Sequence, residues 1–321
     1  MTRYTGGTWP ERLRRVLAWS TRFELAGDSL VLDGRRVPIR NDVIRFRQDD
    51  GYNDSFALQW KKYRETQLDH RSRASLTRER FLRETGWRLD ELPGQAILEA
   101  GCGAGRFTAI MAEAGAALVS FDYSSAVDAN VQNNGGHPNV AFMQCDILDM
   151  PFRQGAFDRV FCHGVLQHTP DPAAAFARLA HLVKPGGLLS VDVYHRDGRI
   201  RPWKSKYLWR GLTTRVEPAK LLAFLEWFIP KWLPIDTLIK RVPVARNYLG
   251  ALIPCFNYYW TDLSREQKVQ WAILDTFDAL SAAYDLPATL DEVRDWFARA
   301  GFARSEVREG GNGIVGNGVK A

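Results

Sequence analysis

A repeated alternation of apolar runs and helical segments over residues 95–194 constrains the fold of this chain more than any other feature. Five apolar runs of strand length occur there, and most are followed by a turn and a segment with helical spacing. The alternation stops at His195 and resumes at Thr289 with one more helix and two last strands. Such a pattern predicts helices on both faces of a parallel sheet. We therefore expect an α/β fold with a doubly wound, mostly parallel sheet of seven strands.

The same pattern divides the chain into four parts. Residues 1–94 form an N-terminal extension of short strands, with a hairpin turn at Asp33-Gly34, followed by helices. Residues 95–194 form the core. Residues 195–285 interrupt the alternation after the fifth strand, are rich in Trp, Leu, Lys and Arg, and are expected to form a helical lid. Residues 286–321 complete the core.

Composition excludes several classes of protein. The four cysteines lie far apart and no CxxC pair occurs, which argues against a disulfide framework or a zinc ribbon. No signal peptide and no apolar run of membrane-spanning length is found, so we expect a cytoplasmic protein. The core carries five basic and nine acidic residues, whereas 1–94 carry 19 and 14, and 195–285 carry 14 and nine. These basic flanks fit either solvated helices or contacts with phosphates, anionic lipid or an acidic substrate.

A glycine-rich turn, in ILEAGCGAGRFT (97–108), follows the first buried run and precedes a helix. Such a turn lets backbone N–H groups approach a ligand closely. NAD enzymes carry a third glycine where this chain has Arg106, and the lysine of phosphate-binding loops is absent. Glu99, just before the turn, suits a ligand with a positive group better than a pyrophosphate.

Two further acids follow at strand ends. Asp122 ends the second run, where a carboxylate can accept both hydroxyls of a ribose. Asp146 follows the third run and can accept an adenine amino proton, with Ile147 against the ring. Together with Glu99, these acids predict a nucleoside ligand with a positively charged tail.

As a set, five segments resemble the motifs of class I S-adenosylmethionine (AdoMet)-dependent methyltransferases: ILEAGCGAGRF, VSFDYS, CDILDMPF, FDRVFCHGVLQHTPDP and LVKPGGLLSVDVY. The resemblance covers residues 95–194 and 289–321. It implies a Rossmann-like fold, AdoMet as cofactor and S-adenosylhomocysteine as product. The roles it implies are contacts with the methionine end (Glu99, Gly101, Cys102, Gly103), the ribose (Asp122), the adenine (Tyr123, Asp146, Ile147) and the region of the methyl group (His163, Gly164).

Three histidines at strand ends are candidates for a general base, which an oxygen nucleophile usually needs. They are His168, His163 and His195, and Tyr194 is a candidate for orienting the substrate. His163 stands where base-modifying methyltransferases carry Asn or Asp, but Gly-Val-Leu follows it, which counts against DNA as a partner. No cluster has metal-ligand spacing, so no metal is expected.

The N-terminal extension and the insertion are expected to determine which acceptor binds. The helical stretch 55–69 presents Gln59, Trp60 and Tyr63, and we expect Trp60 to cover the cofactor. The aromatic and basic insertion fits a lid over a sugar or polyketide, a surface that rests on a membrane, an RNA-binding face, or an ordinary helical core.

The sequence therefore predicts a biosynthetic methyltransferase that acts on a small molecule. O-methylation of a sugar, polyketide, other secondary metabolite or cell-surface glycan precursor is the favoured reaction, and the chain resembles bacterial enzymes of such pathways. A lipid-linked acceptor, a disfavoured RNA acceptor and a non-catalytic AdoMet-binding protein are the alternatives. The sequence leaves a monomer and a homodimer open.

Overall fold

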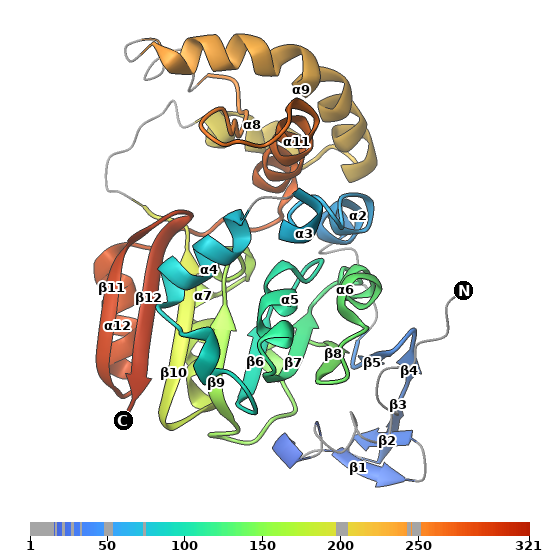
Figure 1. Cartoon of the computed structure of the whole chain (residues 1–321), viewed down its shortest axis with the longest axis vertical. Helices are drawn as coiled ribbons and strands as arrows, with labels where there is room; N and C mark the ends of the chain where they lie inside the picture. Colours follow the sequence, from blue (N-terminus) through green and yellow to red (C-terminus); the bar gives the residue numbers. More distant parts are fainter. Residues whose placement is uncertain are drawn as a thin grey trace.

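The computed structural model describes residues 16, 18–20, 23–26, 29–32, 34–47, 54–72, 75–196, 205–242, 245 and 252–321. Asp33 of the expected hairpin turn and Trp203 of the insertion lie outside these residues. Figure 1 shows two layers: a sheet flanked by helices, and a cap of helices at one end of it.

The central sheet has the strand order β11-β12-β10-β9-β6-β7-β8-β5-β4. Neighbours from β10 to β5 are parallel, whereas β12 is antiparallel to both β10 and β11. The chain order reverses between β6 and β9, which is where open parallel sheets bind ligands. The strands are β4 (Ile39–Arg40), β5 (Val43–Arg45), β6 (Ala96–Ala100), β7 (Ala117–Asp122), β8 (Val140–Gln144), β9 (Phe157–Cys162), β10 (Val183–Val193), β11 (Phe302–Gly310) and β12 (Gly313–Lys320).

The expected doubly wound, mostly parallel sheet is confirmed, but its size of seven strands is wrong. The extension adds β5 beside β8, and β4 pairs with β5 in turn. Val43 and Ile44 are fully buried, so this short hairpin is held by apolar contacts as well as by backbone pairing. The sequence predicted short strands in the extension, but strands of two and three residues show no periodicity that would assign them to the central sheet. The rest of the extension's strands, β1 (Phe23–Ala26), β2 (Ser29–Leu32) and β3 (Arg35–Val37), form a separate small sheet.

Helices cover both faces of the sheet because alternate strand residues are apolar on each side. On one face, Ile97 and Phe161 pack with Phe107 of α5. On the other face, Leu98 and Val160 belong to the cluster that includes Phe176 of α7. The first face carries α4 (Leu76–Thr85), α5 (Arg106–Glu113) and α6 (Val127–Asn134), and the second carries α7 (Pro172–His181) and α12 (Leu290–Arg299).

The cap joins two segments that are distant in sequence. Helices from the insertion pack around a core that includes Leu225, Ile229 and Phe277, and Leu58 and Tyr63 of the extension contact this core. The cap helices are α2 (Asp54–Lys62), α3 (Asp69–Ser72), α8 (Ser205–Thr213), α9 (Pro218–Arg241) and α11 (Arg265–Ser281). Within the described ranges, no helix is both long and apolar enough to cross a bilayer.

Candidate active site

A cavity of about 770 Å³ lies between the carboxyl ends of the parallel strands and the cap. Its volume falls within the range of about 300–1,000 Å³ that is usual for small-molecule sites. Of the described residues predicted for the site, Glu99 and the candidate base His195 are not among the residues that line the cavity. The predicted residues that line it are Trp60, Gly101, Cys102, Gly103, Asp122, Tyr123, Asp146, Ile147, His163, Gly164, His168 and Tyr194.

The glycine turn forms one wall of the cavity, and the two glycines of the turn that line the cavity, Gly101 and Gly103, both have a positive φ. Gly101 has φ +74, and a Cβ there would lie 2.1 Å from Cγ2 of Val165. Gly103 has φ +51, and a Cβ there would lie 3.0 Å from the indole of Trp60. The Trp60 side chain of α2 therefore rests directly on the turn. Any side chain on these glycines would fill the space between the turn and its cover.

Asp122 projects from the end of β7 into the same wall. Its Oδ2 accepts a hydrogen bond from the Gly103 N–H at 2.9 Å, and its Oδ1 accepts from the N–H and hydroxyl of Ser124 at 2.9 and 2.8 Å. These donors fix the carboxylate at the cavity surface, between the glycine turn and Tyr123. A fixed carboxylate at this strand end is suited to accepting hydroxyl groups of a ribose.

Arg47 from the extension packs against Tyr123 and Asp146, two residues that line the cavity. Its guanidinium lies 3.6 Å from the centre of the Tyr123 ring and 3.7 Å from Asp146 Oδ2. Asp146 Oδ1 also accepts from the Leu148 N–H at 2.8 Å and so begins a short 3-10 helix, Ile147–Asp149. Tyr123 and the buried Ile147 offer flat and apolar surface for a ring in this part of the cavity. Sequence reasoning did not find Arg47, because the extension carries no motif that relates it to the strand ends.

Glu99 is a correction to the predicted site. Its side chain lies on the same face of the sheet as α5 and accepts hydrogen bonds from Thr108 at 2.5 Å and Ser120 at 2.8 Å. Asn130 of α6 donates to both hydroxyls, which completes a buried polar cluster. Burial raises the pKa of Glu99 to about 7. The structure therefore does not bring Glu99 to the cavity, since the alternation of the strand directs this side chain toward the helices.

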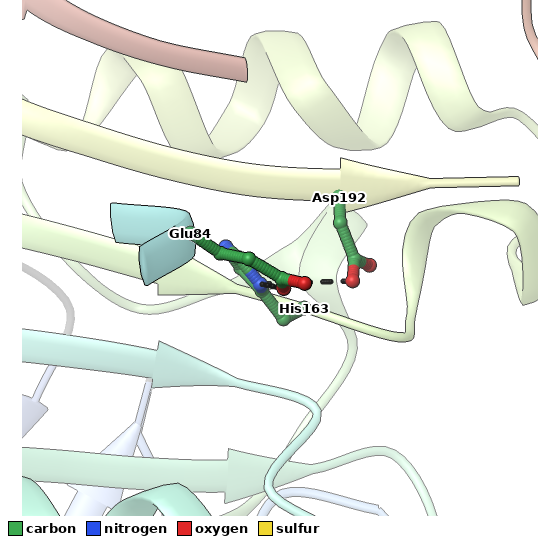
Figure 2. Close-up of side chains that lie close together, drawn as sticks. All are labelled: Glu84, His163 and Asp192. Carbon is green, nitrogen blue, oxygen red and sulfur yellow. Dashed lines mark ion pairs between the residues drawn. The ribbon is translucent and has the colours of Figure 1, made fainter. Parts of the chain in front are cut away.

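His163 also differs from its predicted role as a base. Figure 2 shows its ring beside two buried carboxylates: Nδ1 lies 3.4 Å from Glu84 and 3.6 Å from Asp192. Nε2 lies 2.8 Å from the Ser190 hydroxyl. With both ring nitrogens engaged by protein groups, His163 is not oriented to take a proton from an acceptor.

The carboxylates beside His163 already have a cation. Arg80 donates to Glu84 at 2.9 Å and to Asp192 at 2.6 Å. Burial by itself raises the pKa of Glu84, but hydrogen bonding to His163 and the charge of Arg80 hold that pKa below its ordinary value. Asp192 also accepts from the Gly164 N–H, so the cluster fixes the end of β9. We interpret these residues as an ion-pair network in which Arg80 bridges the two carboxylates.

Arg80 and Arg106 give the cavity a positive end near the glycine turn. Both line it, and Arg106 donates to Gln67 at 2.5 Å. Burial lowers the pKa of Arg106 to about 10, and the neighbouring charge of Arg80 contributes. Sequence reasoning treated Arg106 only as a missing glycine and did not consider Arg80. This end is suited to a carboxylate.

His168 has the geometry of a base. Its Nδ1 lies 2.9 Å from the carbonyl oxygen of Tyr284, and its Nε2 lies 3.7 Å from Asp278 Oδ2. A carbonyl oxygen only accepts, so Nδ1 carries the proton and Nε2 is the basic nitrogen of the neutral ring. The Tyr194 hydroxyl donates to the same oxygen of Asp278 at 3.2 Å, and the rings of His168 and Tyr194 meet edge to face.

Asp278 and its neighbour Asp275 come from α11 of the insertion, and sequence reasoning missed both. Asp275 accepts from the Tyr258 hydroxyl and, at 3.3 Å, from Gln67. Burial raises the pKa of Asp275 to about 6. The available signal was two acids three residues apart in the otherwise apolar run WAILDTFDAL. His195, the third candidate base, pairs with Glu309 at 3.6 Å and is not part of the cavity lining.

Comparisons with known proteins agree with this arrangement. A family model described as a methyltransferase domain matches residues 98–191. The demethylmenaquinone methyltransferase of Corynebacterium kroppenstedtii is 34% identical over 184 residues, which cover 52% of this chain and 76% of that protein. The chain belongs to the class I AdoMet-dependent methyltransferases.

Other similar proteins match this methyltransferase over shorter parts. A ubiquinone biosynthesis O-methyltransferase of Xanthomonas campestris is 33% identical over 108 residues, 33% of this chain and 45% of that one. An uncharacterized Synechococcus protein is 35% identical over 118 residues, 35% of this chain and 28% of its own. The chain thus spans less than half the length of these two relatives. The magnesium protoporphyrin IX methyltransferase of Synechocystis, solved with bound S-adenosylhomocysteine, has a TM-score of 0.41 at 17% identity, with 86% of this chain and 90% of that chain covered.

The cofactor that this methyltransferase family uses fits the residues of the cavity. AdoMet has a ribose, an adenine and a carboxylate, and the cavity has a fixed Asp122, the flat Tyr123 and the guanidinium of Arg80. Gly101 and Gly103, where a Cβ would meet Val165 and Trp60, line the same cavity.

Proposed function

We propose that this methyltransferase binds AdoMet in the cavity and methylates a hydroxyl group of a small acceptor, with His168 as general base. The observation that carries the proposal is the position of His168 in the cavity lining. Its Nδ1 faces the Tyr284 carbonyl at 2.9 Å and its Nε2 faces Asp278 at 3.7 Å.

In this proposal the cofactor extends from the edge of β8 to the glycine turn. Asp122 accepts the ribose hydroxyls, Tyr123 and Ile147 contact the adenine, and Arg80 binds the methionine carboxylate. The ion-pair network of Glu84, Asp192 and His163 holds the guanidinium of Arg80 in place. Bound AdoMet supplies an electrophilic methyl group on a sulfonium.

The residues around His168 then serve the acceptor. His168 Nε2 would take the proton of the acceptor hydroxyl, and the Asp278 carboxylate would stabilise the resulting imidazolium. Tyr194 orients Asp278 through its hydroxyl. Trp60 and Phe56 line the cavity and keep water from this space, and Phe56 also packs against the His168 ring, with centroids 5.2 Å apart.

The acceptor is a ring compound in this proposal, because aromatic side chains of the cap line the cavity. These are Phe256, Tyr258, Trp260, Trp271 and Tyr284. Flat apolar walls of this kind suit an aromatic ring or one face of a sugar. Two relatives are named for quinone compounds, demethylmenaquinone and ubiquinone, which supports testing phenolic and quinol acceptors alongside sugars.

The test is a methyl-transfer screen with radiolabelled AdoMet against phenols, quinols and sugars. His168→Ala should reduce turnover on any acceptor found by about 10²–10⁴-fold, the usual contribution of a positioned base. His181→Ala, an exposed histidine at the end of α7, is the matched control and should leave turnover unchanged. A loss of less than tenfold in His168→Ala would contradict the assignment of the base. Binding of S-adenosylhomocysteine without turnover of any acceptor would favour a non-catalytic AdoMet-binding protein.

A further inference from the structure

The helix α9 has apolar side chains on two opposite faces, and only one of them is covered. Leu221, Leu225 and Ile229 are buried on the inner face, in the core that α9 shares with α11. On the opposite face, Trp227 is 59% exposed and Leu238 is 66% exposed. We define the outer face of α9 as Lys220, Phe224, Trp227, Lys231, Ile235 and Leu238.

The spacing of these residues makes the outer face continuous. Steps of three and four residues place them in one line along a helix, which at about 1.5 Å per residue is about 36 Å long. Figure 1 shows α9 along the outer rim of the cap, away from the sheet. Of the sixteen exposed large apolar side chains in the described part of the chain, ten fall within residues 205–242. Exposed apolar surface is therefore concentrated on this part of the cap, and patches of that kind mark interaction sites.

The charges of this segment indicate which surface it contacts. Residues 205–242 contain seven basic and three acidic residues. Glu226 is bound by Lys62 and Tyr63, the buried Asp236 is bound by Lys240 and Asn257, and Glu217 pairs with Lys220 at 2.9 Å, so all three acids are paired within the protein. The segment is left with a surplus of positive charge beside its apolar side chains.

Along the outer face itself, Lys220 and Lys231 flank the two aromatic residues Phe224 and Trp227. The Lys231 ammonium lies 3.8 Å from the centre of the Trp227 ring. The centres of protein–protein interfaces are depleted of lysine, whereas helices that lie in the headgroup region of a bilayer combine Trp, Phe and Leu with Lys and Arg. We propose that the outer face of α9 docks this protein on the surface of an anionic lipid bilayer.

Docking at this face has a consequence for the site. The helix that contacts the lipid packs on α11, which supplies Asp275 and Asp278 to the cavity lining. A bilayer at the outer rim of the cap therefore lies one helix layer away from the acceptor side of the cavity. Membrane docking does not depend on which acceptor is methylated, so its test stands apart from that of the proposed function.

The experiment is co-sedimentation of the full-length protein with vesicles. Phosphatidylcholine vesicles that contain phosphatidylglycerol should pellet the protein, and added salt or pure phosphatidylcholine should weaken binding. Phe224→Ser/Trp227→Ser should weaken binding at least about tenfold, because two aromatic side chains no longer enter the interface. Lys220→Gln/Lys231→Gln should weaken it about thirtyfold, about fivefold for each charge. Arg294→Gln/Arg299→Gln on α12 removes two exposed charges from the sheet side of the molecule and should have no effect.

Two outcomes would overturn the proposal. One is wild-type protein that stays in solution with anionic vesicles, or binds them equally well after both outer-face substitutions. The other is a concentration-dependent dimer in light scattering that dissociates in Phe224→Ser/Trp227→Ser, since the face would then be an interface between copies of the chain. Binding of S-adenosylhomocysteine by each variant verifies that the fold is intact.

Discussion

Asp278→Asn tests whether the insertion completes the site or only covers it. The substitution keeps the size of the side chain and a group that can bond to the Tyr194 hydroxyl. It removes the negative charge 3.7 Å from His168 Nε2. The proposed step creates a positive charge on that ring, so the loss appears in the transition state rather than in cofactor binding.

The geometry sets the size of the effect. Opposite unit charges at this distance attract by about 4 kcal/mol at an effective dielectric constant of about 20. The Asp278 side chain is 22% exposed, and it already accepts a hydrogen bond from Tyr194, so solvent and that dipole reduce the attraction. We take the remaining attraction between Asp278 and the protonated His168 ring as about 2 kcal/mol, half of the full value. Its loss corresponds to a fall in kcat of about 30-fold.

The assay is steady-state methyl transfer with separate kcat and KM values. Asp278→Asn should lower kcat and leave the KM for AdoMet within about twofold. Asp295→Asn, on the exposed side of α12, is the control. When Asp278→Asn is added to His168→Ala, kcat should fall little further, because the two residues act as a unit. Wild-type turnover in Asp278→Asn, or a further thirtyfold loss on top of His168→Ala, would refute the reasoning.

Three further predictions concern stability. Gly101→Ala should lower the free energy of unfolding by about 1–3 kcal/mol, since its Cβ would lie 2.1 Å from Val165 at φ +74; an unchanged melting temperature would contradict this. Burial raises the pKa of Glu99 from 4.5 to about 7, so the free energy of unfolding of the wild-type protein should fall by about 3 kcal/mol as pH rises through that window. Urea titrations at about pH 5 and pH 8 should show this fall in the wild-type protein and not in Glu99→Gln. Identical pH dependence in both proteins would disprove the prediction. Arg80→Met leaves Glu84 and Asp192 without their cation and should cost about 3–5 kcal/mol in the same titrations; a cost below 1 kcal/mol would count against the network.

The sequence predicted the parts of the site that follow strand ends, because a parallel sheet brings those ends together whatever surrounds them. Asp122, Tyr123 and His168 were found in this way, and all three line the cavity. Glu99, which the resemblance placed at the methionine end of the cofactor, is buried and does not line the cavity. Its position next to the turn suggested a ligand contact. The alternation of side chains along β6 instead directs the Glu99 side chain to the face of the sheet that α5 covers, where it accepts hydrogen bonds from Thr108 and Ser120.

The residues that the sequence did not predict come from segments outside the parallel strands. Arg80 lies in the extension and Asp278 in the insertion, and each reaches the cavity only through packing between distant parts of the chain. Neither a periodicity nor a motif relates α4 or α11 to the sheet. Short strands were predicted in the extension, but two or three residues carry no pattern that assigns β4 and β5 to the central sheet. The buried Val43 and Ile44 take their positions from pairing with β8.

Calorimetric titration of S-adenosylhomocysteine into the wild-type protein and Asp122→Ala tests most directly whether the cavity holds the cofactor. Asp122 is held at the cavity wall by Gly103 and Ser124, and its proposed bonds to the ribose are charge-assisted. The wild-type protein should bind one equivalent, and Asp122→Ala should bind about 10- to 100-fold more weakly, a loss of about 1–3 kcal/mol. No binding to the wild-type protein, or equal affinity in Asp122→Ala, would contradict the assignment of this cavity as the AdoMet site.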